Sequence, residues 1–130
     1  MQQRTSPPTP AATTGHDPRP ADVAVMRETA RRLLSIGEVP PLVEDVAELS
    51  AMLRGHVELL VPEIEALLPG FPVGDVPAAI ARVGAEEASR RLNAPQGPGT
   101  DAAYRQAKKL AMSVFSLCDH YENLRGARTR

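Results

Sequence analysis

The stretch LVEDVAELSAMLRGHVELLVPEIEALL, residues 42–68, decides the fold. Its apolar side chains, with one histidine among them, recur at steps of three and four residues, which is the period of one face of an α-helix. The stripe consists of Leu42, Val46, Leu49, Leu53, His56, Leu60, Ile64 and Leu67. A stripe this long predicts one helix over 42–68 that buries a single face.

Pro62 lies inside that pattern. A proline in a helix removes one backbone donor and crowds the preceding turn, so it bends or breaks the helix. Because the stripe keeps its phase through Ile64 and Leu67, we expect a kink at Pro62 rather than a break. The carbonyl of Glu58 then lacks its amide partner, and Glu58 faces away from the stripe, where water can satisfy it.

Capping residues and apolar spacing predict two further helices. Asp22 is a good N-cap for a helix over 22–36, which Gly37 is placed to end. Asp75 is the expected N-cap of a helix over 75–93. The expected buried faces are Val23, Met26, Ala30, Leu33 and Leu34 in the first, and Val76, Ile80, Val83 and Leu92 in the second.

The last predicted helix, 101–124, has the widest apolar arc and is expected to contact several neighbours. Thr100 is its expected N-cap, and Gly126 its expected end. The central stripe holds Tyr104, Ala107, Ala111, Val114, Cys118 and Tyr121, with Leu110, Leu117 and Leu124 on one flank and Met112 and Phe115 on the other.

Four amphipathic helices without a strand pattern predict a small all-α four-helix bundle over 21–125, with an up-down-up-down course. Residues 1–20 are rich in proline and threonine and have no apolar period, so we expect a disordered tail. The ending 126–130 is expected to be a basic, frayed segment.

Composition restricts the classes of function. No apolar run is long enough for a membrane span, and Cys118 has no second cysteine to pair with, so the cytoplasm is the expected location. A net charge of −1 without a concentrated basic face argues against nucleic-acid binding. The chain has no metal-binding, phosphate-loop or nucleophile motif, so we expect no metal, no cofactor and no catalytic residue.

Polar residues on the 42–68 helix form the first candidate cluster. His56 lies near the edge of the apolar stripe and is expected to be half-buried with one hydrogen-bond partner. Arg54 lies on the opposite flank of the same stripe, so the two side chains cannot meet at one point on a neighbouring helix.

The segment LCDHYENL, residues 117–124, forms the second cluster. Helical geometry predicts that Cys118 and Tyr121 point inward, that Asp119 lies on the flank and that His120 points outward. Glu122 is predicted to face inward, where a carboxylate needs a cation. The candidate cations are Arg27, Arg31 and Arg54.

Four segments carry a resemblance to a known family: VMRETARRLL (25–34), LRGHVELLVPEIEAL (53–67), RRL (90–92) and LCDHYENL (117–124). Together they resemble a family of small, uncharacterised helical proteins from Streptomyces and related actinobacteria, some of which are labelled natural product biosynthesis proteins. The resemblance covers residues 21 to about 125. It implies a biosynthetic setting and supplies no catalytic residues.

Two functions from different classes remain open. The first is a non-enzymatic interaction or accessory protein that binds a partner protein or itself, guided by an acidic ridge on the 42–68 helix and by arginines on the helices over 22–36 and 75–93. The second is a small-ligand-binding protein or enzyme with a pocket between the second and fourth helices. That pocket is predicted to be lined by His56, Cys118, Tyr121 and Glu122, with Arg54 or Asp119 at its rim.

Overall fold

The chain forms four α-helices in the residues that the computed structural model describes, 21–36 and 43–128. They are α1 (Val23–Leu34), α2 (Val43–Leu67), α3 (Val76–Asn93) and α4 (Gly99–Arg128), with a short 3₁₀ turn, η2 (Leu68–Gly70), after α2. These two ranges contain no strand. The predicted all-α four-helix bundle is therefore confirmed, whereas the predicted tail over 1–20, the stripe residue Leu42 and the expected helix end at Gly37 lie outside the described residues.

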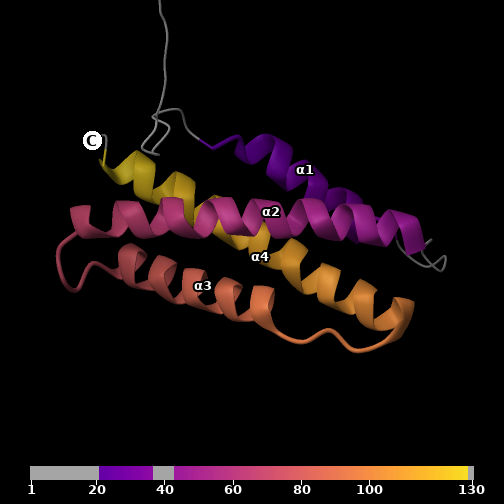
Figure 1. The fold of residues 1–130 in the computed structure, drawn as a ribbon. Coiled ribbons are helices and arrows are strands. Elements are labelled where there is room, and N and C mark those ends of the chain that lie inside the picture. Colours follow the sequence, from indigo (N-terminus) through magenta and orange to yellow (C-terminus); the bar gives the residue numbers. More distant parts are fainter. Residues whose placement is uncertain (1–20, 37–42, 129–130) are drawn as a thin grey trace, which may run out of the picture.

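Helices α2 and α4 form the central pair of the bundle. α4 packs against each of the other three helices, while α1 and α3 lie on opposite sides of the α2–α4 pair (Figure 1). Consecutive helices run in opposite directions, so the up-down-up-down course is also confirmed. None of the helices in these described ranges is long and apolar enough to cross a membrane.

The two aspartate caps are present as predicted. The Asp22 side chain accepts a hydrogen bond from the Val25 amide at 3.1 Å, and the Asp75 side chain accepts one from the Ala78 amide at 3.0 Å. Each cap satisfies one of the free amides in a first helical turn. The capping aspartates thus fix where α1 and α3 begin.

Helix α4 is longer than predicted at both ends. It begins at Gly99, so Thr100 lies within the first turn rather than capping it, and it continues to Arg128, through the expected end at Gly126. A glycine inside a helix costs about 1 kcal/mol relative to alanine. The helix nevertheless continues through Gly126 from a turn that the almost fully buried Leu124 holds in the core.

The apolar stripe of α2 forms the centre of the core, as predicted. The side chains of Val46, Leu49, Leu53, Leu60 and Ile64 are buried, while His56 and Leu67 are half-buried. The predicted central stripe of α4 is buried except for the half-buried Tyr104. Met112, expected on the buried flank of α4, is instead 55% exposed, because α3 and α1 cover the other sides of this helix.

The predicted buried face of α3 is wrong. Val76, Ile80 and Val83 are 64, 53 and 62% exposed, and of the expected stripe only Leu92 packs against the core. The buried face consists of Ala78, Ala81, Ala85 and Ala88, which also recur at steps of three and four. Alanines let helix backbones approach closely, and the His120 ring lies so near Gly84 that an added Cβ would be 2.9 Å from it. Because α3 packs closely against its neighbours, it buries the face with the small residues.

Helix α2 continues without interruption through Pro62, which agrees with the expectation that the proline does not break the helix (Figure 1). The bend in its axis stays a prediction. Glu58 is exposed, so its carbonyl can be hydrated as the sequence suggested.

We expect the substitution Pro62→Ala to leave stability nearly unchanged or slightly reduced. Pro62 is exposed, and alanine gains up to about 3 kcal/mol of helix propensity there. A straightened helix would withdraw Ile64 and Leu68, both buried, from their contacts, at about 1 kcal/mol or more each. Thermal melts of both proteins measure the balance, and a much higher melting temperature for the variant would show that the proline has no packing role.

Candidate functional site

The six predicted site residues do not line one pocket. They are Arg54, His56, Cys118, Asp119, Tyr121 and Glu122. Arg54 reaches from α2 to the end of α3, while the other five lie on the α1 side of the bundle, in contact with α1 or with Ala21, two residues before it. The structure therefore separates Arg54 from the five other residues with which the sequence suggested it might share a ligand.

His56 has the environment that the sequence predicted. It is half-buried on α2, and its Nε2 lies 3.1 Å from the hydroxyl of Thr29 on α1. Burial lowers the pKa of His56 below its ordinary value because the charged form loses hydration. His56 therefore links α1 to α2 as a neutral side chain.

We expect His56 to make the folded state less stable in mild acid. Its pKa is lower in the folded chain than in the unfolded one, where it is about 6.5, so the unfolded chain binds a proton more readily as the pH falls. The free energy of unfolding should decline from about pH 7 toward pH 5. Chemical denaturation across that range measures the decline, and His56→Gln, which retains a polar group for Thr29, should flatten it. An unchanged profile in the variant would contradict this assignment.

Cys118 is fully buried on α4, as predicted. Its thiol points toward the Val23 carbonyl of α1, with the sulfur 4.0 Å from that oxygen. Burial raises the pKa of the Cys118 thiol to about 11. A buried thiol that keeps its proton is neither a nucleophile nor a metal ligand.

We expect Cys118 to resist alkylation until the bundle unfolds. Iodoacetamide reacts with the thiolate, and burial suppresses both the thiolate and its access to reagent. Mass spectrometry over a urea series should show modification that follows the unfolding transition. Rapid modification in native buffer would mean that α1 separates from α4 readily.

Tyr121 holds the start of α1 against the end of α4. Its ring is buried, and its hydroxyl oxygen accepts hydrogen bonds from the Ala21 amide at 2.9 Å and from Arg125 at 3.1 Å. The Arg125 guanidinium also lies over the ring, 5.5 Å from its centre. The inward orientation of Tyr121 is confirmed, and its hydroxyl group forms its hydrogen bonds within the fold.

Arg27 on α1 forms ion pairs with two carboxylates of α4. Its Nη2 lies 2.6 Å from Asp119 and 2.8 Å from Glu122. These two hydrogen bonds raise the pKa of Arg27, so it stays charged. Arg27 was one of the predicted cations, but the predicted inward orientation of Glu122 is wrong. Half of its side chain is exposed, so its carboxylate meets Arg27 at the surface between α1 and α4.

His120, predicted to point outward, is half-buried against α3. Its ring packs beside Gly84, and its Nε2 lies 3.2 Å from the hydroxyl of Ser116. Only a residue without a side chain at position 84 leaves room for this ring. His120 thus contributes to packing between α3 and α4.

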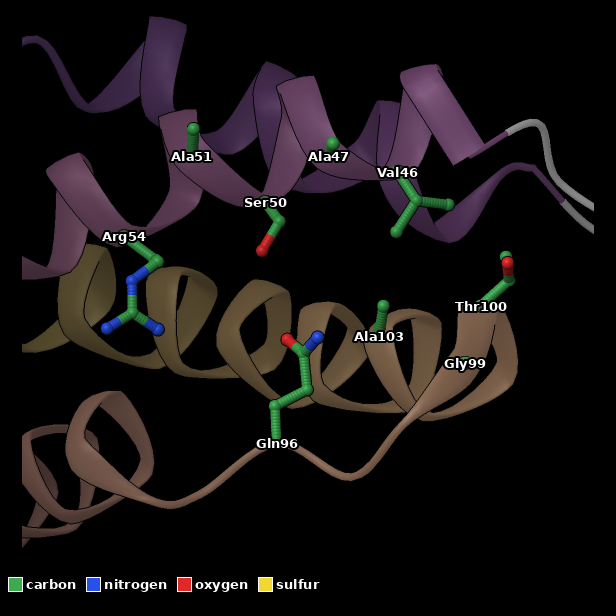
Figure 2. Close-up of a pocket in the computed structure, with 9 residues that line it drawn as sticks. All are labelled: Val46, Ala47, Ser50, Ala51, Arg54, Gln96, Gly99, Thr100 and Ala103. Atoms are coloured by element: carbon green, nitrogen blue, oxygen red, sulfur yellow. The ribbon is translucent and has the colours of Figure 1, made fainter.

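A groove does lie between α2 and α4, at the opposite end of the pair from Tyr121. It has a volume of about 540 Å³. Its walls are Val46, Ala47, Ser50, Ala51 and Arg54 of α2, Gly99, Thr100 and Ala103 of α4, and Gln96 of the α3–α4 connection (Figure 2). The predicted location between the second and fourth helices thus holds a hollow, but of the predicted wall residues only Arg54 lines it.

The Arg54 guanidinium stands at one end of this groove. Its Nη2 donates to the Leu92 carbonyl at 2.9 Å, and Gln106 of α4 donates to the neighbouring Arg91 carbonyl at 2.6 Å. These bonds satisfy carbonyls in the last turn of α3, where a positive charge is also favourable. Figure 2 shows the Ser50 hydroxyl and the Gln96 amide directed into the space between the helices.

Sequence reasoning missed Ser50, Gln96 and Thr100 as lining residues. The available signal was the run of small side chains at Ala47, Ser50 and Ala51, on the side of α2 next to its stripe. Within residues 21–36 and 43–128, no group of three or more histidine, cysteine or acidic side chains gathers as a metal site would require.

The fold and groove define a small all-α bundle protein with an amphipathic hollow between α2 and α4. The chain belongs to the family described as "Family of unknown function (DUF6415)", whose model matches residues 24–126. The match spans all four helices apart from the first residue of α1 and the last two residues of α4. No curated protein and no solved structure matches the chain.

Proposed function

We propose that the protein is a non-enzymatic helical accessory protein that docks through the outer face of α3, and that its first partner is α3 of a second copy. The resemblance to actinobacterial proteins labelled with natural product biosynthesis supports a biosynthetic or regulatory setting in the cytoplasm. The observation that carries the proposal is the exposure of Val76, Ile80 and Val83.

These three side chains form one apolar stripe on the solvent side of α3. They follow one another at steps of four and three residues, so they lie along a single line of the helix. The buried side of α3 is made of alanine, although the larger side chains would have contributed more by burial. An exposed line of branched apolar residues on one helix indicates a contact surface.

The stripe is nearly symmetric about Ile80. In an antiparallel pair of α3 helices related by a two-fold axis, Ile80 lies opposite Ile80 of the second copy, and Val76 lies opposite its Val83. A two-fold contact requires such a self-complementary surface. This register favours a second copy over a partner of different sequence.

The expected association is weak. The contact holds six side chains, three from each protomer, and each gains less than the roughly 1.5–3 kcal/mol of a fully buried side chain because it is already partly covered in the monomer. Association costs about 4–15 kcal/mol of lost freedom, which is of similar size. A stable dimer buries about 1,200 Å² or more, and three side chains per protomer fall short of that area. The dimer should therefore form and dissociate with protein concentration.

Charge provides less support than the sequence suggested. Three of the arginines on α1 and α3 that were expected to guide a partner form ion pairs within the chain. Arg27 pairs with Asp119 and Glu122, Arg31 with Glu28, and Arg91 with Glu87. The apolar stripe rather than the charge asymmetry supports docking.

Sedimentation velocity over a wide range of protein concentration tests the proposal. The native chain should shift from monomer to dimer, and Ile80→Glu should remain monomeric because it places two carboxylates opposite each other in the contact. Val25→Glu is the matched control, since Val25 is similarly exposed but lies on α1. A native chain that stays monomeric at millimolar concentration, or an Ile80→Glu dimer, would overturn self-association.

A further inference from the structure

The groove between α2 and α4 exists because α3 is shorter than the helices it covers. α3 ends at Asn93, so the first turns of α2 and α4 have no helix on this side. Several residues that line it are small, among them Ala47 and Ala51 of α2 and Ala103 of α4 (Figure 2). The chain thus leaves an apolar hollow beside its core.

Arg54 gives one end of this hollow a positive charge. The guanidinium has five N–H donors, of which the Leu92 carbonyl takes one. No acidic side chain in the described part of the chain forms an ion pair with Arg54, unlike Arg27, Arg31 and Arg91. The bond to Leu92 also holds the half-buried side chain in place. A fixed cation beside apolar walls is complementary to a carboxylate on an apolar molecule.

The remaining polar groups and the volume suit a small molecule. Ser50 and Gln96 supply a hydroxyl and an amide along the walls. The volume of about 540 Å³ is within the roughly 300–1,000 Å³ of small-molecule sites.

We propose that this groove binds a small organic acid whose carboxylate pairs with Arg54 and whose apolar body lies against Ala47, Ala51 and Ala103. This ligand site is separate from the docking face of α3 and does not depend on it.

Titration calorimetry with decanoate, and with 1-decanol as its uncharged counterpart, tests the site. Decanoate should bind the native chain more tightly than decanol. Arg54→Met should weaken decanoate binding by about tenfold or more, while decanol binding changes little. Arg82→Met, which removes an exposed arginine of α3 outside the groove, should change neither affinity.

A second variant leaves Arg54 and its bond to α3 intact. The double substitution Ala47→Leu with Ala51→Leu fills the groove from exposed positions and should abolish decanoate binding. Ala66→Leu, at an exposed position of α2 away from the groove, is its control. Equal decanoate binding by the native chain and the filled variant would overturn the proposal, as would no binding at millimolar decanoate or equal affinity for decanol. Ile80→Glu, which should abolish self-association through α3, should bind decanoate as the native chain does. Failure of the docking proposal can therefore be distinguished from failure of the ligand site.

Discussion

Replacement of Leu53 by alanine is expected to lower the free energy of unfolding by about 2–5 kcal/mol. Leu53 lies at the middle of the α2 stripe and is fully buried in the core, and α4 is the helix that α2 contacts most extensively. Alanine at this position loses the transfer free energy of the leucine and leaves a cavity that the two long helices cannot close, since each is held by neighbours on both sides. For a domain of this size, such a loss is a large part of the total stability.

Urea denaturation followed by far-UV circular dichroism measures this effect. Met52→Ala is the matched control, because Met52 is the adjacent residue on the same helix but is exposed. The free energy of unfolding of Met52→Ala should differ from that of the native chain by no more than about 0.5 kcal/mol. A Leu53→Ala variant as stable as Met52→Ala would contradict the placement of the α2 stripe in the core.

The contrast between α2 and α3 shows why the fold was predictable and one of its faces was not. In α2, the large apolar residues of the stripe recur along one line and the charged residues all lie off that line, so burial of the stripe decides the orientation of the helix. In α3, two lines compete: Val76, Ile80 and Val83 on one side, and Ala78, Ala81 and Ala85 on the other. Periodicity favours the larger side chains. The distance between backbones in the finished bundle favours the alanines, and a single sequence carries no direct signal of that distance.

The site was predictable only where it depended on one helix. The half-buried state of His56 and the inward orientation of Cys118 and Tyr121 follow from their angles on α2 and α4. The ion pairs of Arg27 depend on where α1 crosses α4, so three cations were possible for Glu122 from the sequence alone, and its predicted burial was wrong. The groove depends on α3 ending before its neighbours and on several small side chains meeting, and no motif marks that combination.

Replacement of Ala81 by leucine provides the sharpest test of the orientation of α3. Ala81 is fully buried on the alanine face, and its helix packs against both α2 and α4. A leucine adds three carbons where the backbones are too close to accept them, so α3 must move or adopt strained rotamers. Overpacking of this kind costs about 1–3 kcal/mol, and more where the surroundings are rigid.

The same substitution at Ala79 supplies the control. Ala79 is exposed, two residues away on the same helix, so Ala79→Leu has equal chemistry and similar helix propensity without the clash. Urea denaturation at low protein concentration, where association through α3 is negligible, should show a strongly destabilised Ala81→Leu and an almost unchanged Ala79→Leu. If α3 instead buried Val76, Ile80 and Val83, Ala81 would face solvent and the leucine there would be tolerated. An Ala81→Leu variant as stable as the native chain would therefore indicate that Val76, Ile80 and Val83 are buried in the core, and the basis for docking through α3 would be lost.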